Sequence, residues 1–159
     1  MRLLSKLPTS EGTNPLVLAT FQGAQTAQNR PRILFYGHYD VISAPSEGWD
    51  SDPFTLTGRD GYLYGRGATD NKGPILAVAC AASALLAKRA LACDLVFIIE
   101  GEEESGSVGF SEAVKRNIEA IGRADAILVS NSTWISEDRP CITYGLRGVV
   151  HCSVEVPFN

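Results

Sequence analysis

Three short apolar runs, each followed directly by polar residues, constrain the fold of this chain more than any other feature. They lie at residues 32–36, 95–99 and 126–129. Continuous apolar runs of this length are typical of strands that are covered on both faces. Helical patterns at 75–86 and 110–120 lie between them. Strands that alternate with helices predict an α/β domain with a mainly parallel mixed sheet and flanking helices, and periodicity leaves the strand order open.

Polar residues gather where the predicted strands end. His38 follows the first run, an acidic segment at 100–107 follows the second, and Asn131 follows the third. Ligands of parallel sheets bind outside the carboxyl ends of the strands. We expect these side chains to converge on Asp70, which stands between a glycine-rich loop and the longest helical pattern. Pro74 fits the first turn of that helix, because its missing N–H costs nothing there.

The spacing of His38 and Asp40 favours a metal ligand over a structural histidine. A lone histidine at a strand end is more often hydrogen-bonded and structural. Two residues apart on an extended segment, however, the two side chains share one face. Asp40 can then accept the second ring N–H of His38 and fix the imidazole for metal binding. These residues therefore predict a metal site at the strand end.

The run from Glu102 to Glu104 has two interpretations. It is either a solvated acidic turn or a site with two functional carboxylates, one that binds metal and one that acts as general base. Its place directly after a buried-type strand favours the second. A nucleotide site is disfavoured, because Asp70 stands where the third glycine of a Gly-x-Gly-x-x-Gly loop would be and would repel phosphate. Lys72 also lacks the following Ser or Thr of a phosphate-binding loop.

Composition narrows the class of protein. The 159 residues are 45% hydrophobic, which suffices for one domain with a core. Eighteen acidic against fourteen basic residues leave no basic patch, so we expect no nucleic-acid partner. The absence of a long apolar run or signal-peptide core predicts a cytoplasmic protein without a membrane contact.

Two further elements are predicted from local patterns. A strand is expected at 15–21, and a long surface loop at 43–61.

The four cysteines are scattered, without a C-x-x-C pair, and are expected to be reduced. Cys80 falls in an apolar helical pattern, and Cys141 and Cys152 fall in strand-like runs. We therefore predict that these three are buried as small hydrophobic residues and do not ligate metal.

Four segments, at 37–41, 65–73, 100–107 and 140–148, together resemble the di-zinc metallopeptidases of the carnosinase, aminoacylase and glutamate carboxypeptidase family. The stretch 130–148 is also similar to a fungal subunit of the glutathione-degrading complex, which works with a glutamine-amidotransferase-like partner. The resemblance implies a zinc-dependent hydrolase that cleaves an amide bond in a small peptide or γ-glutamyl-type substrate, as dipeptidases and carboxypeptidases do. It also implies a homodimer at full length.

The resemblance assigns a role to individual residues. His38 matches a ligand of one zinc ion. Asp70 matches the carboxylate that bridges two zinc ions, with a cis peptide bond to Asn71. Glu104 matches a ligand of the second ion, and Glu103 matches the general base. With Asp40 orienting His38, Glu103 and Asp40 form the expected catalytic pair.

Two departures from the family pattern limit this expectation. Asn131 falls where close relatives carry an aspartate ligand, and a neutral amide is weaker, so this metal is expected to bind loosely or not at all. An ordinary strand-end turn residue is the alternative for Asn131. The chain also stops before the histidine expected for the Glu104 ion, so this chain alone is expected to be inactive. The alternative function is that of a weakly metallated or non-catalytic subunit, which acts by binding a partner.

The predicted domain organisation follows from the same alignment of motifs. Residues 1–148 are expected to form the amino-terminal portion of the catalytic domain, and 149–159 the start of a lid or dimerisation domain. The alternating run at 149–156 predicts the first strand of that lid. His151 lies in this run and is expected to have a structural or surface role.

Overall fold

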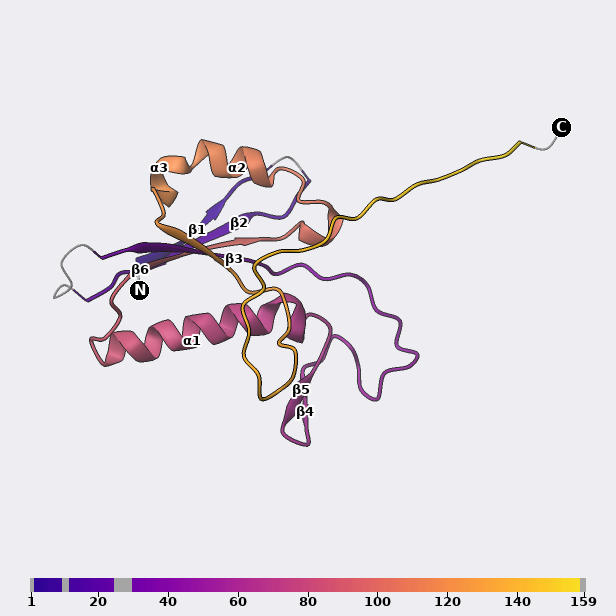
Figure 1. The fold of residues 1–159 in the computed structure, drawn as a ribbon, viewed down its shortest axis with the longest axis horizontal. Helices are drawn as coiled ribbons and strands as arrows, with labels where there is room; N and C mark the ends of the chain where they lie inside the picture. Colours follow the sequence, from indigo (N-terminus) through magenta and orange to yellow (C-terminus); the bar gives the residue numbers. More distant parts are fainter. Residues whose placement is uncertain (1, 10–11, 25–29, 158–159) are drawn as a thin grey trace.

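The computed structural model describes residues 2–9, 12–24 and 30–157, and it contains one mixed sheet between helices (Figure 1). The strand order is β1-β2-β6-β3-β7. The strands are β1 (Arg2–Leu7), β2 (Leu16–Phe21), β3 (Arg32–His38), β6 (Asp94–Glu100) and β7 (Ala126–Val129). β6, β3 and β7 are parallel, whereas β1 and β2 form an antiparallel edge. Figure 1 shows α1 on one side of the sheet and α2 with α3 on the other, which confirms the predicted fold class.

The register of the parallel strands brings their carboxyl ends level. His38 lies opposite Glu100 in the β3–β6 pair, and Tyr36 lies opposite Val129 in the β3–β7 pair. Two residues further along, Asn131 is therefore level with His38. The three predicted strand-end segments meet at one edge of the sheet, as the sequence indicated.

Two hydrophobic clusters hold the helices against the sheet. Phe97 of β6 belongs to the cluster under α1, together with Ala82, and its ring centroid is 5.0 Å from that of Phe35. Val96 and Ile98, the alternate residues of β6, belong to the cluster under α2 and α3. This alternation explains the continuous apolar run, because both faces of the strand are covered.

The helices differ from their predicted bounds in one respect. α1 (Gly73–Ala87) carries Pro74 in its first turn, as predicted. The helix expected at 110–120 is divided into α2 (Phe110–Arg116) and α3 (Ile118–Ile121). Asn117 breaks it, because its side-chain nitrogen donates to the carbonyl of Ala113, 2.8 Å away. A side chain that bonds a backbone carbonyl in this way competes with the helix ladder.

Two elements escaped sequence analysis. β1 lies in a stretch for which no strand was predicted. The loop expected at 43–61 ends in the first strand and the turn of a hairpin, which is formed by β4 (Thr57–Arg59) and β5 (Tyr62–Tyr64). Asp60 and Gly61 connect its strands with positive φ angles of 52° and 82°, as a tight hairpin turn requires. The Asp-Gly pair was the available signal.

The predicted strand at 149–156 is wrong. Residues 140–157 contain no helix or strand, and they extend away from the sheet (Figure 1). A strand needs a partner for its backbone groups, and among the described residues none pairs with this run. The lid boundary at 148/149 remains a prediction.

Two of the three cysteines predicted to be buried are exposed. Cys80 and Cys152 face solvent, and Cys141 is half-buried outside any strand. Cys80 is exposed because it follows Val78 and Ala79, which pack against the sheet, so the helix turns it outward. All four cysteines are free thiols. Within the described ranges, no helix is both long and apolar enough to cross a bilayer.

Candidate metal centre

His38 is the centre of a cluster at the carboxyl edge of the sheet. Its side chain is fully buried at the end of β3. Its Nε2 atom lies 2.8 Å from Oδ1 of Asp70 and 3.9 Å from Oε2 of Glu103. One ligand atom each from His38, Asp70 and Glu104 lie within 4.8 Å of one another. Three segments far apart in sequence therefore present nitrogen and oxygen donors to one point.

Asp40 connects His38 with the acidic segment, although not quite as predicted. The carbonyl oxygen of Asp40, rather than its carboxylate, is the hydrogen-bond partner of Nδ1 of His38, at 3.2 Å. The carboxylate oxygen Oδ1 lies 3.3 Å from the same nitrogen. The other carboxylate oxygen accepts the backbone N–H of Glu104 at 2.9 Å. Because Nδ1 faces two acceptors, Nε2 is left to face Asp70 and Glu103.

Asp70 lies in an irregular turn, η1 (Ala68–Lys72), directly before α1. Its φ and ψ angles of −121° and 94° are extended rather than helical, and the residue that precedes α1 as its N-cap is Lys72, not Asp70. The peptide bond to Asn71 is cis, as the family resemblance implied. Gly73 permits this tight turn, since a Cβ atom there would lie 2.2 Å from the carbonyl oxygen of Ala68.

The three consecutive glutamates have different environments. Glu102 accepts hydrogen bonds from the backbone and side-chain nitrogens of Asn14, at 2.7 and 2.8 Å, and from the hydroxyl of Ser105. Glu103 and Glu104 are in a short turn, η2 (Glu103–Ser105), and face the His38 cluster. The acidic run is therefore anchored by its first member and is not a free solvated turn.

The charges of the cluster shift two pKa values. Partial burial raises the pKa of Glu103 above its ordinary value, and the neighbouring carboxylates of Glu104 and Asp70 add to this, while His38 opposes it. Burial lowers the pKa of His38, but the hydrogen bond to Asp70 and the charge of Glu103 outweigh it, so this pKa is raised. Burial is thus the larger cause of the raised pKa of Glu103, whereas the neighbouring negative groups are what raise the pKa of His38.

Asn131 lies next to the cluster but bonds to Asn71. Its Oδ1 atom accepts a hydrogen bond from Nδ2 of Asn71 at 3.0 Å. Asn71 in turn accepts the backbone N–H of His38 at 3.2 Å. Asn131 is thus connected to His38 through Asn71, and its amide oxygen, the atom that could bind a metal, accepts a hydrogen bond from Asn71.

The same motifs match a family of peptidases. Residues 34–156 match the model of peptidase family M20/M25/M40, which is well over half of the chain. The chain belongs to this family. The match spans β3, the turn with Asp70, the acidic segment and β7, so every segment of the cluster lies within it.

Known members of the M20 family include peptidases that are similar to this chain over most of its length. The chain is 44% identical over 156 residues to the probable di- and tripeptidase DUG2 of Saccharomyces cerevisiae, covering 94% of this chain and 18% of that protein. It is 45% identical over 147 residues to the Beta-Ala-His dipeptidase of Rattus norvegicus, covering 91% and 29%. The chain thus spans less than a third of the length of these relatives.

A solved structure supports the fold and the use of metal. The M20 family metallo-carboxypeptidase Sso-CP2 from Sulfolobus solfataricus superimposes with a TM-score of 0.73 and 31% identity, covering 82% of this chain and 29% of that one. The mixed sheet with flanking helices is therefore that of M20 peptidases.

A divalent metal ion fits the side chains found here. Imidazole nitrogen and carboxylate oxygen are both ligands of divalent metal ions in proteins, and this cluster offers one of the first and two of the second. Oδ1 of Asp40 is buried without a hydrogen-bond partner, close to the ring of His38. A ring nitrogen that is oriented by a carboxylate on its far side is typical of metal-binding histidines.

Sequence reasoning missed two buried polar residues of this M20 domain, Asn71 and Glu100. Glu100 is 3% exposed and accepts hydrogen bonds from the hydroxyls of Tyr36 and Ser107. It links β3 to the end of the acidic segment. Burial and this contact with Glu100 raise the pKa of Tyr36. A glutamate that ends an apolar strand was the available signal for Glu100.

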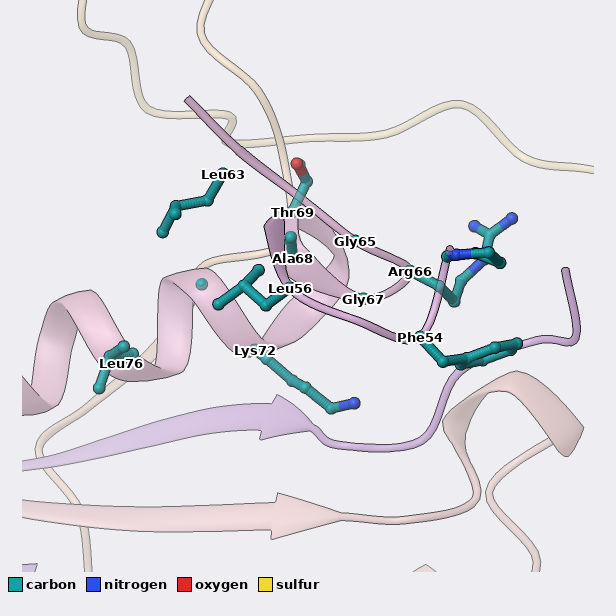
Figure 2. Close-up of a pocket in the computed structure, with 12 residues that line it drawn as sticks. Phe54, Leu56, Leu63, Gly65, Arg66, Gly67, Ala68, Thr69, Lys72 and Leu76 are labelled. Atoms are coloured by element: carbon teal, nitrogen blue, oxygen red, sulfur yellow. The ribbon is translucent and has the colours of Figure 1, made fainter. Parts of the chain in front are cut away.

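Two hollows lie near the cluster. One, with a volume of about 300 Å³, lies beside the turn that carries Asp70, and its lining residues are drawn in Figure 2. Its larger side chains are Phe54, Leu56, Leu63, Leu76, Arg66 and Lys72. Its described lining includes no candidate metal ligand, so this apolar hollow is not where the chemistry would occur. A second, open hollow of about 320 Å³ is lined by Asp40 and Glu104, among others, and adjoins the cluster directly.

Proposed function

We propose that the protein containing this chain is a zinc-dependent hydrolase that cleaves an amide bond in a small peptide or γ-glutamyl-type substrate. The observation that carries the proposal is the convergence of His38, Asp70 and Glu104, whose ligand atoms lie within 4.8 Å of one another. Glu103 stands beside them, 3.9 Å from Nε2 of His38. Metal donors and a separate carboxylate at one point are the groups that metal-assisted hydrolysis needs.

In this proposal, His38 and Asp70 would hold one divalent ion, and Asp70 and Glu104 would hold a second. A bound divalent ion would polarise the scissile carbonyl and make a water molecule more acidic. Asp40 keeps the ring of His38 oriented, so that Nε2 remains turned toward Asp70. The expected further histidine for the second ion is not among the residues that converge here.

Glu103 is the proposed general base. Its carboxylate takes a proton from the attacking water and passes it to the leaving amine nitrogen, so the proton count balances over the reaction. The neighbouring Glu102 cannot take this role, because both of its oxygens are engaged by Asn14 and Ser105. The open hollow lined by Asp40 and Glu104 is the proposed approach of the substrate.

The finer assignments extend the same proposal. The names of the relatives, a di- and tripeptidase and a dipeptidase, support a short peptide substrate. The resemblance to the glutathione-degrading subunit supports a γ-glutamyl type of bond and an amidotransferase-like partner. A cytoplasmic location is part of the same proposal. A homodimer of the complete protein belongs to this proposal as well.

One observation favours a second candidate, a weakly metallated subunit that acts through partner binding. Asn131 is neutral, and its amide oxygen bonds to Asn71. The His38 side of the site then has one carboxylate fewer than the pattern that it resembles. Hard and borderline cations depend strongly on such charge.

Zinc content and peptide hydrolysis of the full-length gene product separate the two candidates. We expect bound zinc and hydrolysis of dipeptides such as Cys-Gly, with both lost in His38→Ala. Glu112→Gln, which removes an exposed carboxylate on α2, is the matched control and should retain both. Full-length protein that lacks zinc and hydrolyses neither dipeptides nor γ-glutamyl peptides would refute the hydrolase and leave the partner-binding subunit.

A further inference from the structure

The side chain of Asn71 lies next to the cluster of candidate ligands around His38 and is completely buried. Its Oδ1 atom accepts the backbone N–H of His38 at 3.2 Å. Its Nδ2 atom donates to the carbonyl of Ser130 at 2.8 Å and to Oδ1 of Asn131 at 3.0 Å. One carboxamide therefore makes three hydrogen bonds, and both of its polar atoms are satisfied.

The partners of Asn71 come from two different strand ends. His38 ends β3, whereas Ser130 and Asn131 directly follow β7. Asn71 itself is the neighbour of Asp70 in the chain. The three segments that carry the candidate ligands His38, Asp70 and Asn131 thus meet in this one side chain.

The packing around Asn71 leaves little room for another arrangement. A Cβ atom at Gly37 would lie 2.6 Å from Oδ1 of Asn71 and 2.8 Å from the side chain of Ile75. Glycine at position 37 therefore lets the carboxamide approach the backbone of β3. This explains the Gly-His order of the motif from contacts alone.

Only a carboxamide of this length meets the chemical demand. The site needs one acceptor for an N–H group and donors for two oxygens. Aspartate has the same shape but no donor, and leucine has neither donor nor acceptor. Loss of the donors would leave the carbonyl of Ser130 without this buried partner, which is costly.

We propose that Asn71 is a positioning residue of the metal centre: its carboxamide fixes the ends of β3 and β7 relative to Asp70 and so sets the spacing of the metal ligands. This inference rests on the proposed function, in that it assumes a metal at His38 and Asp70. It assigns Asn71 no contact with the metal. Residues that orient ligands in this way affect metal affinity on the order of 10–100-fold.

The proposal also predicts coupling between positions 71 and 131. With Asn71 present, an aspartate at 131 still accepts the hydrogen bond from Nδ2. With aspartate at 71, the amide of Asn131 can turn and donate its own nitrogen. With aspartate at both positions, two carboxylates face each other without a donor between them. The double substitution is therefore expected to weaken zinc binding by more than the sum of the two single effects predicts.

Titration with zinc alone, and the visible spectrum of the Co²⁺-substituted protein, test the inference. Asn71→Asp should weaken zinc binding on the order of 10–100-fold and change the Co²⁺ spectrum. Asn117→Asp is the matched control, because it removes another side-chain donor, 2.8 Å from the carbonyl of Ala113, on the far face of the sheet. It should leave zinc affinity and the Co²⁺ spectrum unchanged. Wild-type affinity and spectrum in Asn71→Asp would overturn the proposal.

Amide hydrogen exchange on the metal-free wild-type protein tests the same contact without any substitution, so it does not depend on whether a variant folds. The N–H of His38 should exchange as slowly as those of the β3 core, since Asn71 accepts it. Fast exchange at His38 alone would overturn the positioning role, even if Asn71→Asp fails to fold. If the wild type shows slow exchange but binds no zinc, the proposed function fails while the contact stands.

Discussion

The strand β6 and the segment at 132–157 are both rich in apolar residues, yet their side chains are exposed to very different extents. Val96 and Ile98 of β6 are at most 2% exposed, whereas Ile142 and Leu146 are each 90% exposed. β6 lies between two paired strands and under helices on both faces. In the later segment, Ile142 and Leu146 have no such cover. Apolar sequence produces order only where another element covers it.

The two histidines of the chain show the same difference for polar groups. His38 is fully buried, and its ring contacts Asp40 and Asp70. His151 is exposed in the segment without regular structure. Position in the sheet, rather than residue type, makes one of them a candidate ligand.

The largest expected effect is on turnover and zinc binding, and it concerns Glu103 and Glu104 at the end of β6. In the full-length protein, Glu103→Gln should lower turnover by about 10²–10⁴-fold while zinc stays bound, because it removes only the proposed proton acceptor. Glu104→Gln should instead lower zinc occupancy. Turnover and zinc content, measured on the same preparations, check this. Equal zinc loss in both variants would show that the roles are wrongly assigned.

Core truncation tests the difference between the regions directly. Ile98→Ala should destabilise the fold by about 2–5 kcal/mol, because it leaves a cavity between β6 and the α2–α3 layer. Ile142→Ala, the same change at a side chain that is 90% exposed, should stay within about 0.5 kcal/mol. Urea unfolding of both variants gives the two values. A large loss in Ile142→Ala would mean that the later segment packs in solution.

A smaller gain is expected from Asn131→Asp in the full-length protein. The aspartate keeps the hydrogen bond from Asn71 on one oxygen and offers the other, charged, to the His38 side. We expect zinc affinity to rise on the order of tenfold, or about 1.4 kcal/mol, in a calorimetric titration. Unchanged or weaker binding would show that position 131 is not at the metal, or that the new charge is left unpaired.

The smallest effect is expected at His151. Its replacement by alanine should leave zinc affinity unchanged, because the residue is exposed and far along the chain from the cluster. The same titration, with His38→Ala as the positive control, measures this. Loss of zinc in His151→Ala would make the later segment part of the site.

Local patterns predicted the features that depend on neighbouring residues. The strand at 126–129 has the predicted bounds, and the helix with Pro74 in its first turn is present. The convergence of His38 and the acidic segment followed from the rule that parallel strands present their carboxyl ends together, whereas Asp70 was placed by its position before the helix and Glu104 was assigned as a ligand by the family resemblance. Helix and strand periodicity carry this information because they report which face of an element is covered.

Contacts between distant segments could not be predicted in the same way. Asn71 and Glu100 carry no periodic signal, and their importance appears only when β3, β7 and the acidic segment lie side by side. The run at 149–156 has a strand pattern, but a strand requires a partner that the pattern itself does not supply. The Asp40 carbonyl took the hydrogen bond assigned to its carboxylate, because both groups lie within reach of the same ring nitrogen.

The sequence by itself determined the order of β2, β3, α1, β6 and β7 along the chain, the M20 motifs, and the set of polar residues at the strand ends. Only the tertiary structure decided the strand order, the engagement of Asn131 by Asn71, and the burial of Glu100 beneath the acidic segment. The physical reason is the separation along the chain over which each kind of interaction acts. Propensity and periodicity act over a few residues, whereas hydrogen bonds such as that between Asn71 and Asn131 join groups 60 positions apart, which only the folded sheet brings together.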